Sequence, residues 1–198
     1  MTTPGWDAAY TSGMPAPWDI GRPQPAFVRL AESGLLSGRV LDAGCGTGEH
    51  ALLAAAHGAD AAGIDISPWA IGRAREKAAE RGLRARFEVA DALNLGPLGL
   101  TFDTVIDSGL FHVFDDQERA RYVTSLASVL PPGGTCYLMC FSDRQGGDFG
   151  PRRVSQDELR AAFASGWTVE DIAAETFELT PGLPLASAQS WLATIRRQ

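Results

Sequence analysis

An acid followed by three alternating glycines is the part of this chain best suited to chemistry. The run at residues 40–48, VLDAGCGTG, passes from an apolar pair through Asp42 into the glycines. The alanine-rich segment at 49–57 then predicts a helix. A strand that enters a glycine loop at a helix N-terminus presents converging backbone N–H groups and no side chains, so a ligand can lie directly on the backbone.

The spacing of the glycines distinguishes this loop from two common phosphate-binding loops. A dinucleotide loop, G-x-G-x-x-G, needs a glycine where this chain has Glu49. A P-loop ends in Gly-Lys-Ser/Thr, which the run lacks. An NAD-linked reductase is therefore disfavoured. The D-x-G-x-G-x-G spacing instead resembles the first motif of class I S-adenosylmethionine (SAM)-dependent methyltransferases.

Acids also stand at the ends of four predicted strands: Asp42, Asp65, Asp91 and Asp107. In open α/β sheets, ligands bind beyond the carboxyl ends of the strands. Carboxylates suit the ammonium, ribose hydroxyls and adenine amine of SAM. Each acid by itself is equally typical of a helix cap or a loop. Four of them at one sheet edge favour a binding site.

The elements that must position these residues alternate between strand and helix from Phe27 onward, which predicts a parallel sheet with crossover helices. The predicted strands cover residues 39–42, 61–65, 85–89, 102–107, 135–141, 168–179 and 187–195. The predicted helix N-caps are Ser67, Asp115 or Asp116, and Ser155. No helix separates the last two strands, so they should pair antiparallel. The first 25 or so residues show no periodicity and are expected to be irregular.

The predicted fold class is α/β, a Rossmann-like doubly wound sheet with helices on both faces. Its sheet has seven strands and is mostly parallel, with an antiparallel last strand. We expect a lid segment at residues 1–26 and a single SAM-binding methyltransferase domain at 27–198. Such an architecture is the one that class I methyltransferases share, and the resemblance of the motifs spans roughly residues 38–142.

The resemblance implies a role for each motif residue. Asp65 would bind the ribose, Asp91 and Ala92 the adenine, and Asp107 with Ser108 the methionine end. The other implied cofactor-binding residues are Asp42, Gly44, Cys45, Gly46, Thr47, Gly48 and Ile66. The implied cofactor is S-adenosyl-L-methionine.

The segment at 17–27, PWDIGRPQPAF, narrows the family. It resembles the P-W-D-x-G-x-x-x-P segment of thiopurine and thiol or halide methyltransferases. It is closer still to small bacterial enzymes that O-methylate quinolones and naphthoquinone-type compounds. Trp18 would face the sulfonium through a cation–π contact, or else staple the first helix. Arg22 would reach the SAM carboxylate or an anionic substrate, or else lie free on the surface.

Two residues are candidates for a general base. His112 follows Asp107 by five residues and has a suitable pKa; the related motif often carries a residue here only to shape the pocket. Tyr10, on the lid, is the weaker candidate. Thiols and acidic phenols arrive ionised and need no base, whereas an ordinary phenol benefits from one. Phe111, Phe114 and Phe149 line an aromatic pocket or pack in the core.

Composition limits the partners. A net charge of −7 over 198 residues argues against nucleic acid. No apolar run approaches the length of a membrane span, and the N-terminus does not resemble a signal peptide. Three cysteines fit a reducing cytoplasm, and the scattered histidines predict no metal site. We expect a cytoplasmic monomer or homodimer.

These observations predict a SAM-dependent methyltransferase that acts on an O or S atom of a small aromatic acceptor. A methyltransferase that detoxifies thiols, halides or metalloids is the first alternative. A non-catalytic SAM-binding protein is the second.

Overall fold

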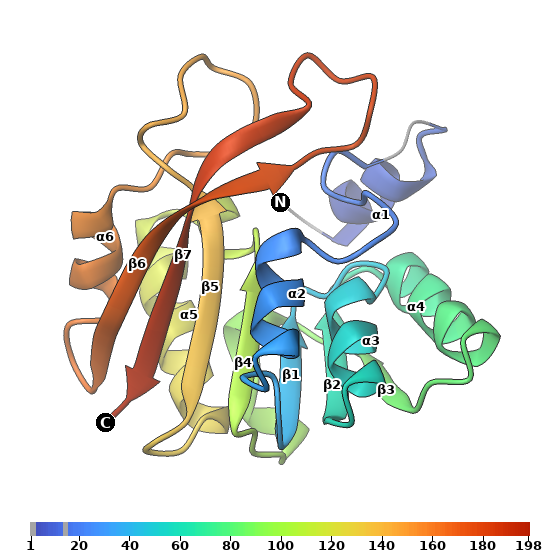
Figure 1. The fold of residues 1–198 in the computed structure, drawn as a ribbon, viewed down its shortest axis with the longest axis horizontal. Helices are drawn as coiled ribbons and strands as arrows, with labels where there is room; N and C mark the ends of the chain where they lie inside the picture. The colour runs from blue at the N-terminus through green and yellow to red at the C-terminus, as the bar shows by residue number, and fades with distance from the viewer. Residues whose placement is uncertain (1–2, 14–15) are drawn as a thin grey trace.

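A computed structural model describes residues 3–13 and 16–198 and shows one seven-stranded sheet (Figure 1). The strand order is β3-β2-β1-β4-β5-β7-β6. The strands are β1 (Arg39–Ala43), β2 (Asp60–Asp65), β3 (Ala85–Val89), β4 (Thr104–Ser108), β5 (Thr135–Phe141), β6 (Trp167–Glu178) and β7 (Ser187–Arg197). Only β7 runs antiparallel to its neighbours, β5 and β6, which confirms the predicted fold class.

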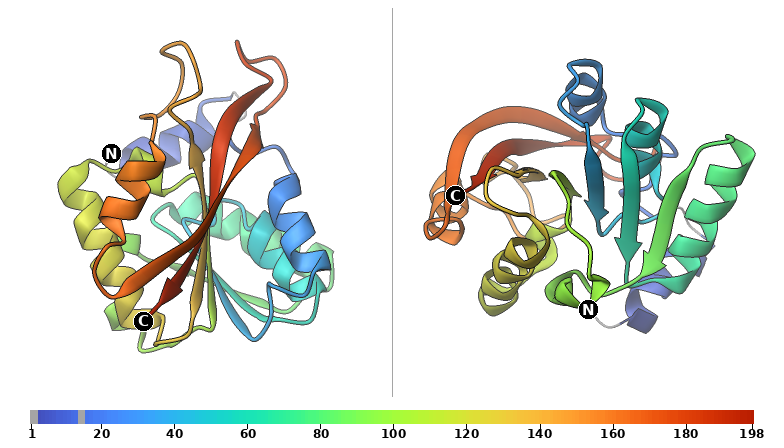
Figure 2. Two further views of the ribbon diagram at one scale, coloured as in Figure 1. Left: turned by 60° about the vertical axis from the view of Figure 1, so that its left-hand side comes forward. Right: turned by 90° about the horizontal axis from the view of Figure 1, so that it is seen from below.

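Helices cover both faces of this sheet. They are α1 (Thr3–Thr11), α2 (Pro25–Glu32), α3 (Glu49–Ala56), α4 (Pro68–Glu80), α5 (Asp116–Val129) and α6 (Gln156–Ala162), with short 3-10 turns η1 (Ala92–Asn94), η2 (Gly96–Leu98) and η3 (Phe111–Val113). With the sheet turned toward its edge, α5 and α6 lie on one side and α2 and α3 on the other (Figure 2). Separate apolar cores fill the two sides.

The order of the strands creates a crevice between β1 and β4. Strand β1 pairs with β2 on one side and with β4 on the other, so the chain changes direction across the sheet at this point. Loops that leave β1 and β4 therefore diverge at their carboxyl ends, where open α/β sheets bind ligands. The hairpin between β6 and β7 extends beyond the same end of the sheet, as does the N-terminal segment (Figure 1).

The predicted helix starts are confirmed. The Ser67 hydroxyl accepts a hydrogen bond from the Ala70 amide, and Asp115 and Ser155 both form capping boxes. Strand β4 begins two residues later than predicted. The reason is local: the Phe102 amide donates to Val129 on α5 rather than to a neighbouring strand.

The N-terminal segment was wrongly expected to be irregular throughout, since α1 is helical. Helix α1 is short, and its two large aromatic residues, Trp6 and Tyr10, lie one helical turn apart. Their rings contact Trp18 and Trp69, so α1 is stabilised by packing. A pattern of one turn is too short to register as helical periodicity in the sequence.

Candidate active site

The glycine loop between β1 and α3 is held by backbone hydrogen bonds. The Cys45 amide donates to the Ile64 carbonyl (2.8 Å), and the Gly48 amide donates to the Cys45 carbonyl (2.9 Å). Gly48 has φ +88°, and a Cβ there would lie within 2.9 Å of both Ala74 and Phe87. The loop can adopt this shape only with glycine at that position.

Asp65, at the end of β2, ties the loop to the next crossover. One carboxylate oxygen accepts from the Gly46 amide and the other from the Ser67 amide, each at 2.8 Å. Burial raises the pKa of Asp65, and the charge of Asp7 adds to this effect, while the two amides oppose it. Ile66 lies between these contacts and is partly buried.

Two of the other acids lie inside the fold. Asp42 accepts from the Ala51 amide of α3 (3.1 Å), and Asp107 accepts from the Leu110 amide (2.8 Å) and the Phe111 amide (3.1 Å). Burial raises the pKa of Asp42 to about 8 and that of Asp107 to about 7. Both carboxyl groups are therefore placed to orient the loops after β1 and β4.

Asp91 differs from these acids because it is exposed. It follows β3 and accepts a hydrogen bond from the Leu93 amide (2.9 Å), which makes it the N-cap of η1. Ala92 behind it is buried. The exposed carboxylate oxygens of Asp91 remain accessible to a ligand at this edge of the sheet.

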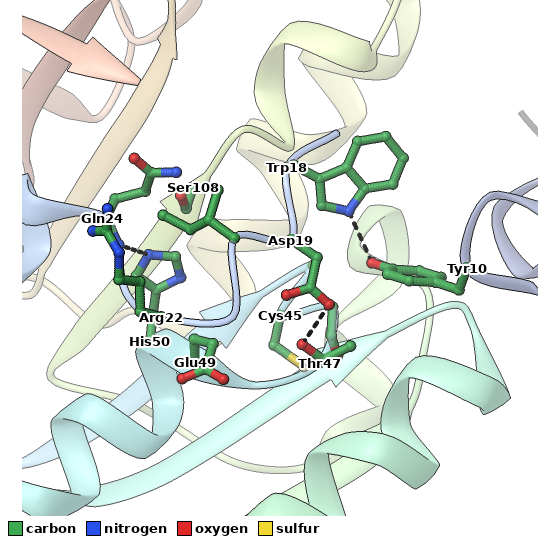
Figure 3. A pocket seen from close by; sticks show the side chains of 13 residues that line it. Tyr10, Trp18, Asp19, Arg22, Gln24, Cys45, Thr47, Glu49, His50 and Ser108 are labelled. Atoms are coloured by element: carbon green, nitrogen blue, oxygen red, sulfur yellow. Dashed lines mark hydrogen bonds between the residues drawn. The ribbon is translucent and has the colours of Figure 1, made fainter. Parts of the chain in front are cut away.

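A pocket lies between the glycine loop and the N-terminal segment (Figure 3). Its lining residues are Tyr10, Trp18, Asp19, Ile20, Arg22, Gln24, Gly44, Cys45, Gly46, Thr47, Glu49, His50 and Ser108. The predicted site residues Trp18, Arg22 and Ser108 thus meet the glycine loop around one space. Asp65 and Asp91 lie outside this pocket, on the side of β2 and β3.

Helix α1 closes one end of this pocket. The Trp18 indole N–H donates to the Tyr10 hydroxyl (3.0 Å), and the Tyr10 ring stacks on Trp69. The Tyr10 hydroxyl lies 2.8 Å from where a Cβ on Gly46 would stand, so it occupies the space that the absent side chain leaves. Burial raises the pKa of Tyr10, and the charge of Asp65 raises it further. A neutral phenol in these surroundings is poorly suited to act as a base.

Residues 16–24 are fastened to the end of β6 as well as to the glycine loop. The Gln24 side chain donates to the Glu178 carbonyl and accepts from the Glu178 amide, both at 2.9 Å. The Thr180 hydroxyl donates to the Ala16 carbonyl (2.7 Å). Arg22 forms an ion pair with Glu178 (2.7 Å) while its side chain stays 58% exposed, so it can exchange this partner for a ligand.

A charged network joins the same segment to α4. The Thr47 hydroxyl donates to Asp19 (2.9 Å), and the Lys77 ammonium donates to Thr47 (2.6 Å) and to Glu49 (2.8 Å). Arg81 completes the network through two hydrogen bonds to Glu49. Burial favours a raised pKa for Glu49, but the hydrogen bonds from the two cations outweigh it and the pKa is lowered.

His112 lies beyond the pocket, on η3. Its side chain is buried, and its Nδ1 accepts a hydrogen bond from the Phe141 amide (3.0 Å). The rings of Phe141 and Phe177 pack against the imidazole. Burial lowers the pKa of His112 to about 3, and the charges of Arg119 and Arg153 contribute. These surroundings do not favour the predicted general base, which needs a free nitrogen and a pKa nearer neutrality.

Sequence reasoning missed four residues that shape the site: Asp19, Gln24, Glu49 and His50. His50 accepts a hydrogen bond from the Gln24 amide (3.1 Å) and so connects α3 to the N-terminal segment. Asp19 and Gln24 belong to the PWDIGRPQP segment, whose resemblance to a known motif already indicates a site role. For Glu49, the sequence shows only that it stands where a dinucleotide-binding loop has its third glycine.

Residues 3–13 and 16–198 contain neither a cluster of metal-ligating side chains nor a helix that could span a membrane. No group of three or more His, Cys, Asp or Glu side chains in this part of the chain could hold a metal ion. None of the helices described is long and apolar enough to cross a membrane.

The sheet order, the glycine loop after β1 and the acid ending β2 define an α/β protein that binds a nucleoside-containing cofactor at the carboxyl ends of its strands. Comparison with known proteins identifies the family. Residues 40–134 match a methyltransferase domain. A 2-heptyl-1-hydroxyquinolin-4(1H)-one methyltransferase of Mycobacteroides abscessus is 42% identical over 79% of this chain and 70% of its own length.

Two further proteins are also similar to this chain. A probable thiol methyltransferase 2 of Arabidopsis thaliana is 31% identical over 78% of this chain and 69% of its own length. A structure solved in work on the conversion of a disulfide bond into a thioacetal group during echinomycin biosynthesis is 41% identical, with a TM-score of 0.90, over 99% of this chain and 93% of the other. The chain therefore belongs to the SAM-dependent methyltransferases, and SAM is its cofactor.

Proposed function

We propose that this enzyme transfers the methyl group of SAM to an ionised O or S atom of a small aromatic acceptor. The observation that carries the proposal is the aromatic cluster of His112, Phe141 and Phe177 at the carboxyl ends of β4 and β5, beside the glycine loop. These side chains are buried, and aromatic rings pack favourably against an aromatic acceptor. The hydroxyquinolone substrate of the Mycobacteroides abscessus relative supports this acceptor class.

The residues present fit the cofactor. The backbone of Gly44–Gly48 carries almost no side chains, and the hydroxyl of Tyr10, on α1, fills the position where a Cβ on Gly46 would stand. In this proposal Asp65 accepts from the ribose hydroxyls, and Asp91 with Ala92 binds the adenine. Arg22 and Ser108 would hold the methionine end, and Trp18 would face the sulfonium. Asp42 and Asp107 position the loops from within.

The N-terminal segment acts as a lid in this proposal, and its two parts have different roles. Residues 16–24 are fixed to β6 by Gln24 and Thr180. Helix α1 holds Tyr10 against Gly46, within the space proposed for the cofactor. Helix α1 must therefore move for the cofactor to enter and can return to exclude water from it.

Bound SAM supplies a methyl carbon activated by a positive sulfur. An anionic acceptor and a cationic donor lose their charges as the methyl group moves, so an environment that excludes water accelerates the step. The acceptor must approach within about 3 Å of the carbon, opposite the sulfur. The protein's contribution is to hold the acceptor in line and dry, and the proposal requires no general base. The three cysteines are free and buried, in keeping with a cytoplasmic enzyme.

Calorimetric titration with SAM and with S-adenosylhomocysteine tests the cofactor half of the proposal, and micromolar binding of both is expected. Methylation of 2-heptyl-1-hydroxyquinolin-4(1H)-one and of thiophenol, followed by mass spectrometry, tests the acceptor half. Similarity to a thiol methyltransferase supports the alternative of thiol or halide detoxification. Turnover of thiophenol and iodide with none of the quinolone would favour that alternative. Cofactor binding without turnover of any of these acceptors would contradict the proposed acceptor class.

A further inference from the structure

The hydrogen bonding of His112 determines which of its ring nitrogens carries the proton. The backbone amide of Phe141 lies 3.0 Å from Nδ1, and an amide N–H can only donate. Nδ1 must therefore be unprotonated. A neutral imidazole with this partner carries its proton on Nε2, which makes Nε2–H a donor.

The surroundings keep the imidazole neutral. Two cations face it from different elements, Arg119 on α5 and Arg153 after β5. The remaining neighbours are the rings of Phe141 and Phe177, at 5.0 and 6.2 Å between centroids. Burial, the adjacent aromatic rings and two positive charges all oppose a second proton. The ring is thus fixed in one tautomer over the pH range in which the enzyme would work.

Nε2 lies next to Gly109, which adjoins a pocket residue. Gly109 has φ +86°, and a Cβ on it would lie 3.2 Å from the Phe177 ring and 3.3 Å from Nε2. These contacts would be tighter than ordinary ones, so only a glycine here leaves the Nε2 side of the imidazole uncovered by a side chain. Ser108, the neighbour of Gly109, lines the pocket next to the glycine loop. Among the described residues, none accepts a hydrogen bond from Nε2, although His112 is only 5% exposed.

We propose that the Nε2–H of His112 donates a hydrogen bond to the acceptor anion and thereby selects acceptors that arrive ionised. The inference rests on the proposed function and narrows it to acidic acceptors such as N-hydroxy heteroaromatics, acidic phenols and thiols. A lone pair of the anionic O or S atom forms the new bond to the methyl carbon. The carbon–sulfur bond of SAM breaks, and its electron pair stays on sulfur. No proton is transferred, and His112 keeps its proton throughout.

This role has a kinetic signature that differs from that of a base. The acceptor keeps part of its negative charge in the transition state, so a hydrogen bond to it stabilises the bound acceptor and the transition state to a similar extent. Loss of the donor should therefore raise KM and leave kcat nearly unchanged. Loss of a general base would lower kcat, and would do so most for weakly acidic acceptors.

Two substitutions separate the donor from the structural hydrogen bond. In His112→Asn, the amide oxygen can accept from Phe141 in place of Nδ1, but the side chain ends short of Nε2. In His112→Gln, an amide N–H reaches toward the position of Nε2. With 2-heptyl-1-hydroxyquinolin-4(1H)-one as acceptor, we expect His112→Asn to raise KM about tenfold or more and to change kcat less than about threefold. We expect His112→Gln to restore most of the affinity, and SAM affinity to be unchanged in both.

The pH profile supplies a second, independent readout. The kcat/KM of the wild type should rise to a plateau at the ionisation of each acceptor, earlier for thiophenol than for phenol. An inflection at one pH for every acceptor would instead indicate a base on the enzyme and overturn the inference. An unchanged KM in a folded, SAM-binding His112→Asn variant would also overturn it. Failure of the wild type to methylate either the quinolone or thiophenol would overturn the proposed acceptor class, and this inference with it.

Discussion

The two halves of the site are built from different interactions. Around the glycine loop, polar contacts dominate: Asp65 holds the Gly46 amide, Asp42 holds α3, and buried Glu49 pairs with two cations. At the ends of β4 and β5, aromatic rings dominate, with Phe141 and Phe177 packed at 5.5 Å between centroids. The first half therefore fixes backbone geometry and charge, whereas the second provides an apolar surface of defined shape.

This difference implies that the two halves differ in how well they tolerate substitutions. A hydrogen-bonded loop tolerates few substitutions, because a lost partner leaves a buried polar group unpaired. An aromatic wall can be reshaped by exchanging one apolar side chain for another at lower cost. We infer that one cofactor site can serve different acceptors by changes confined to the β4–β7 side. Four substitutions test this contrast.

The largest effect is expected from Gly48→Ala, on the cofactor side. An alanine there would keep a strained backbone φ of +88°, and its methyl group would collide with Ala74 and Phe87. Strain and overpacking together should cost about 2–5 kcal/mol, which lowers Tm by about 5–15 °C for a chain of this size. Thermal unfolding followed by circular dichroism measures the change.

Gly58→Ala is the matched control for this substitution. Gly58 has φ +90°, but a Cβ there meets nothing within 4 Å. Backbone strain alone should lower the stability of this variant, by about 1–2 kcal/mol. Equal losses in the two variants would show that close packing under the glycine loop is unimportant.

Asp65→Ala should be next in size. Its carboxylate holds two backbone amides of the loop, and in our proposal it also binds the ribose. Losing these contacts should weaken SAM binding well over tenfold, since a single hydrogen bond to a charged group contributes about 1.5–3 kcal/mol. Calorimetry with SAM measures the loss. Asp60→Ala removes an exposed acid from the other end of β2 and should leave the affinity unchanged; unchanged affinity in Asp65→Ala would contradict the proposed cofactor site.

The contrast between the halves also explains how much the sequence predicted. The seven strands, the glycine loop and the helix caps follow from local patterns within a few residues of each other, and the structure confirms them. The residue roles in the site stay predictions, although Trp18, Arg22 and Ser108 do converge on the glycine loop.

What the sequence did not reveal depends on contacts between distant residues. Gln24 and Glu178 are 154 positions apart, and no pattern within either segment indicates their pairing. The tautomer of His112 depends on the Phe141 amide, 29 positions away. Helix α1 forms because Trp6 and Tyr10 contact Trp18 and Trp69. In each case the partner is set by the folded sheet rather than by neighbouring residues.

On the acceptor side, Phe177→Leu should have a more selective effect. It removes a ring that packs against His112 and Phe141, while leaving the polar contacts of the glycine loop intact. We expect KM for an aromatic acceptor to rise about three- to tenfold, as the loss of about 0.5–1.5 kcal/mol of aromatic contact implies, with no change in SAM affinity. Phe163→Leu, in the core beneath α6, is the control for stability. A matching loss of SAM affinity in Phe177→Leu would refute the independence of the two halves.

The smallest effect is expected from Asp42→Asn, through pH. The pKa of Asp42 is about 8 in the folded protein, against about 3.9 in the unfolded chain. Between those values the folded state holds a proton that the unfolded chain has lost, so the free energy of unfolding falls as pH rises from about 4 to about 8.

Asparagine at position 42 cannot ionise but can still accept a hydrogen bond from the Ala51 amide. The Tm of the variant should therefore gain a few degrees on that of the wild type between pH 5 and pH 6, since one pH unit changes the free energy of unfolding by about 1.4 kcal/mol. Asp103→Asn, at an exposed acid whose pKa is lowered by a hydrogen bond from Arg39, should show a constant difference over the same range. A constant difference for Asp42→Asn as well would mean that Asp42 is ionised in the folded protein, and that the cofactor half holds a buried charge rather than a neutral acid.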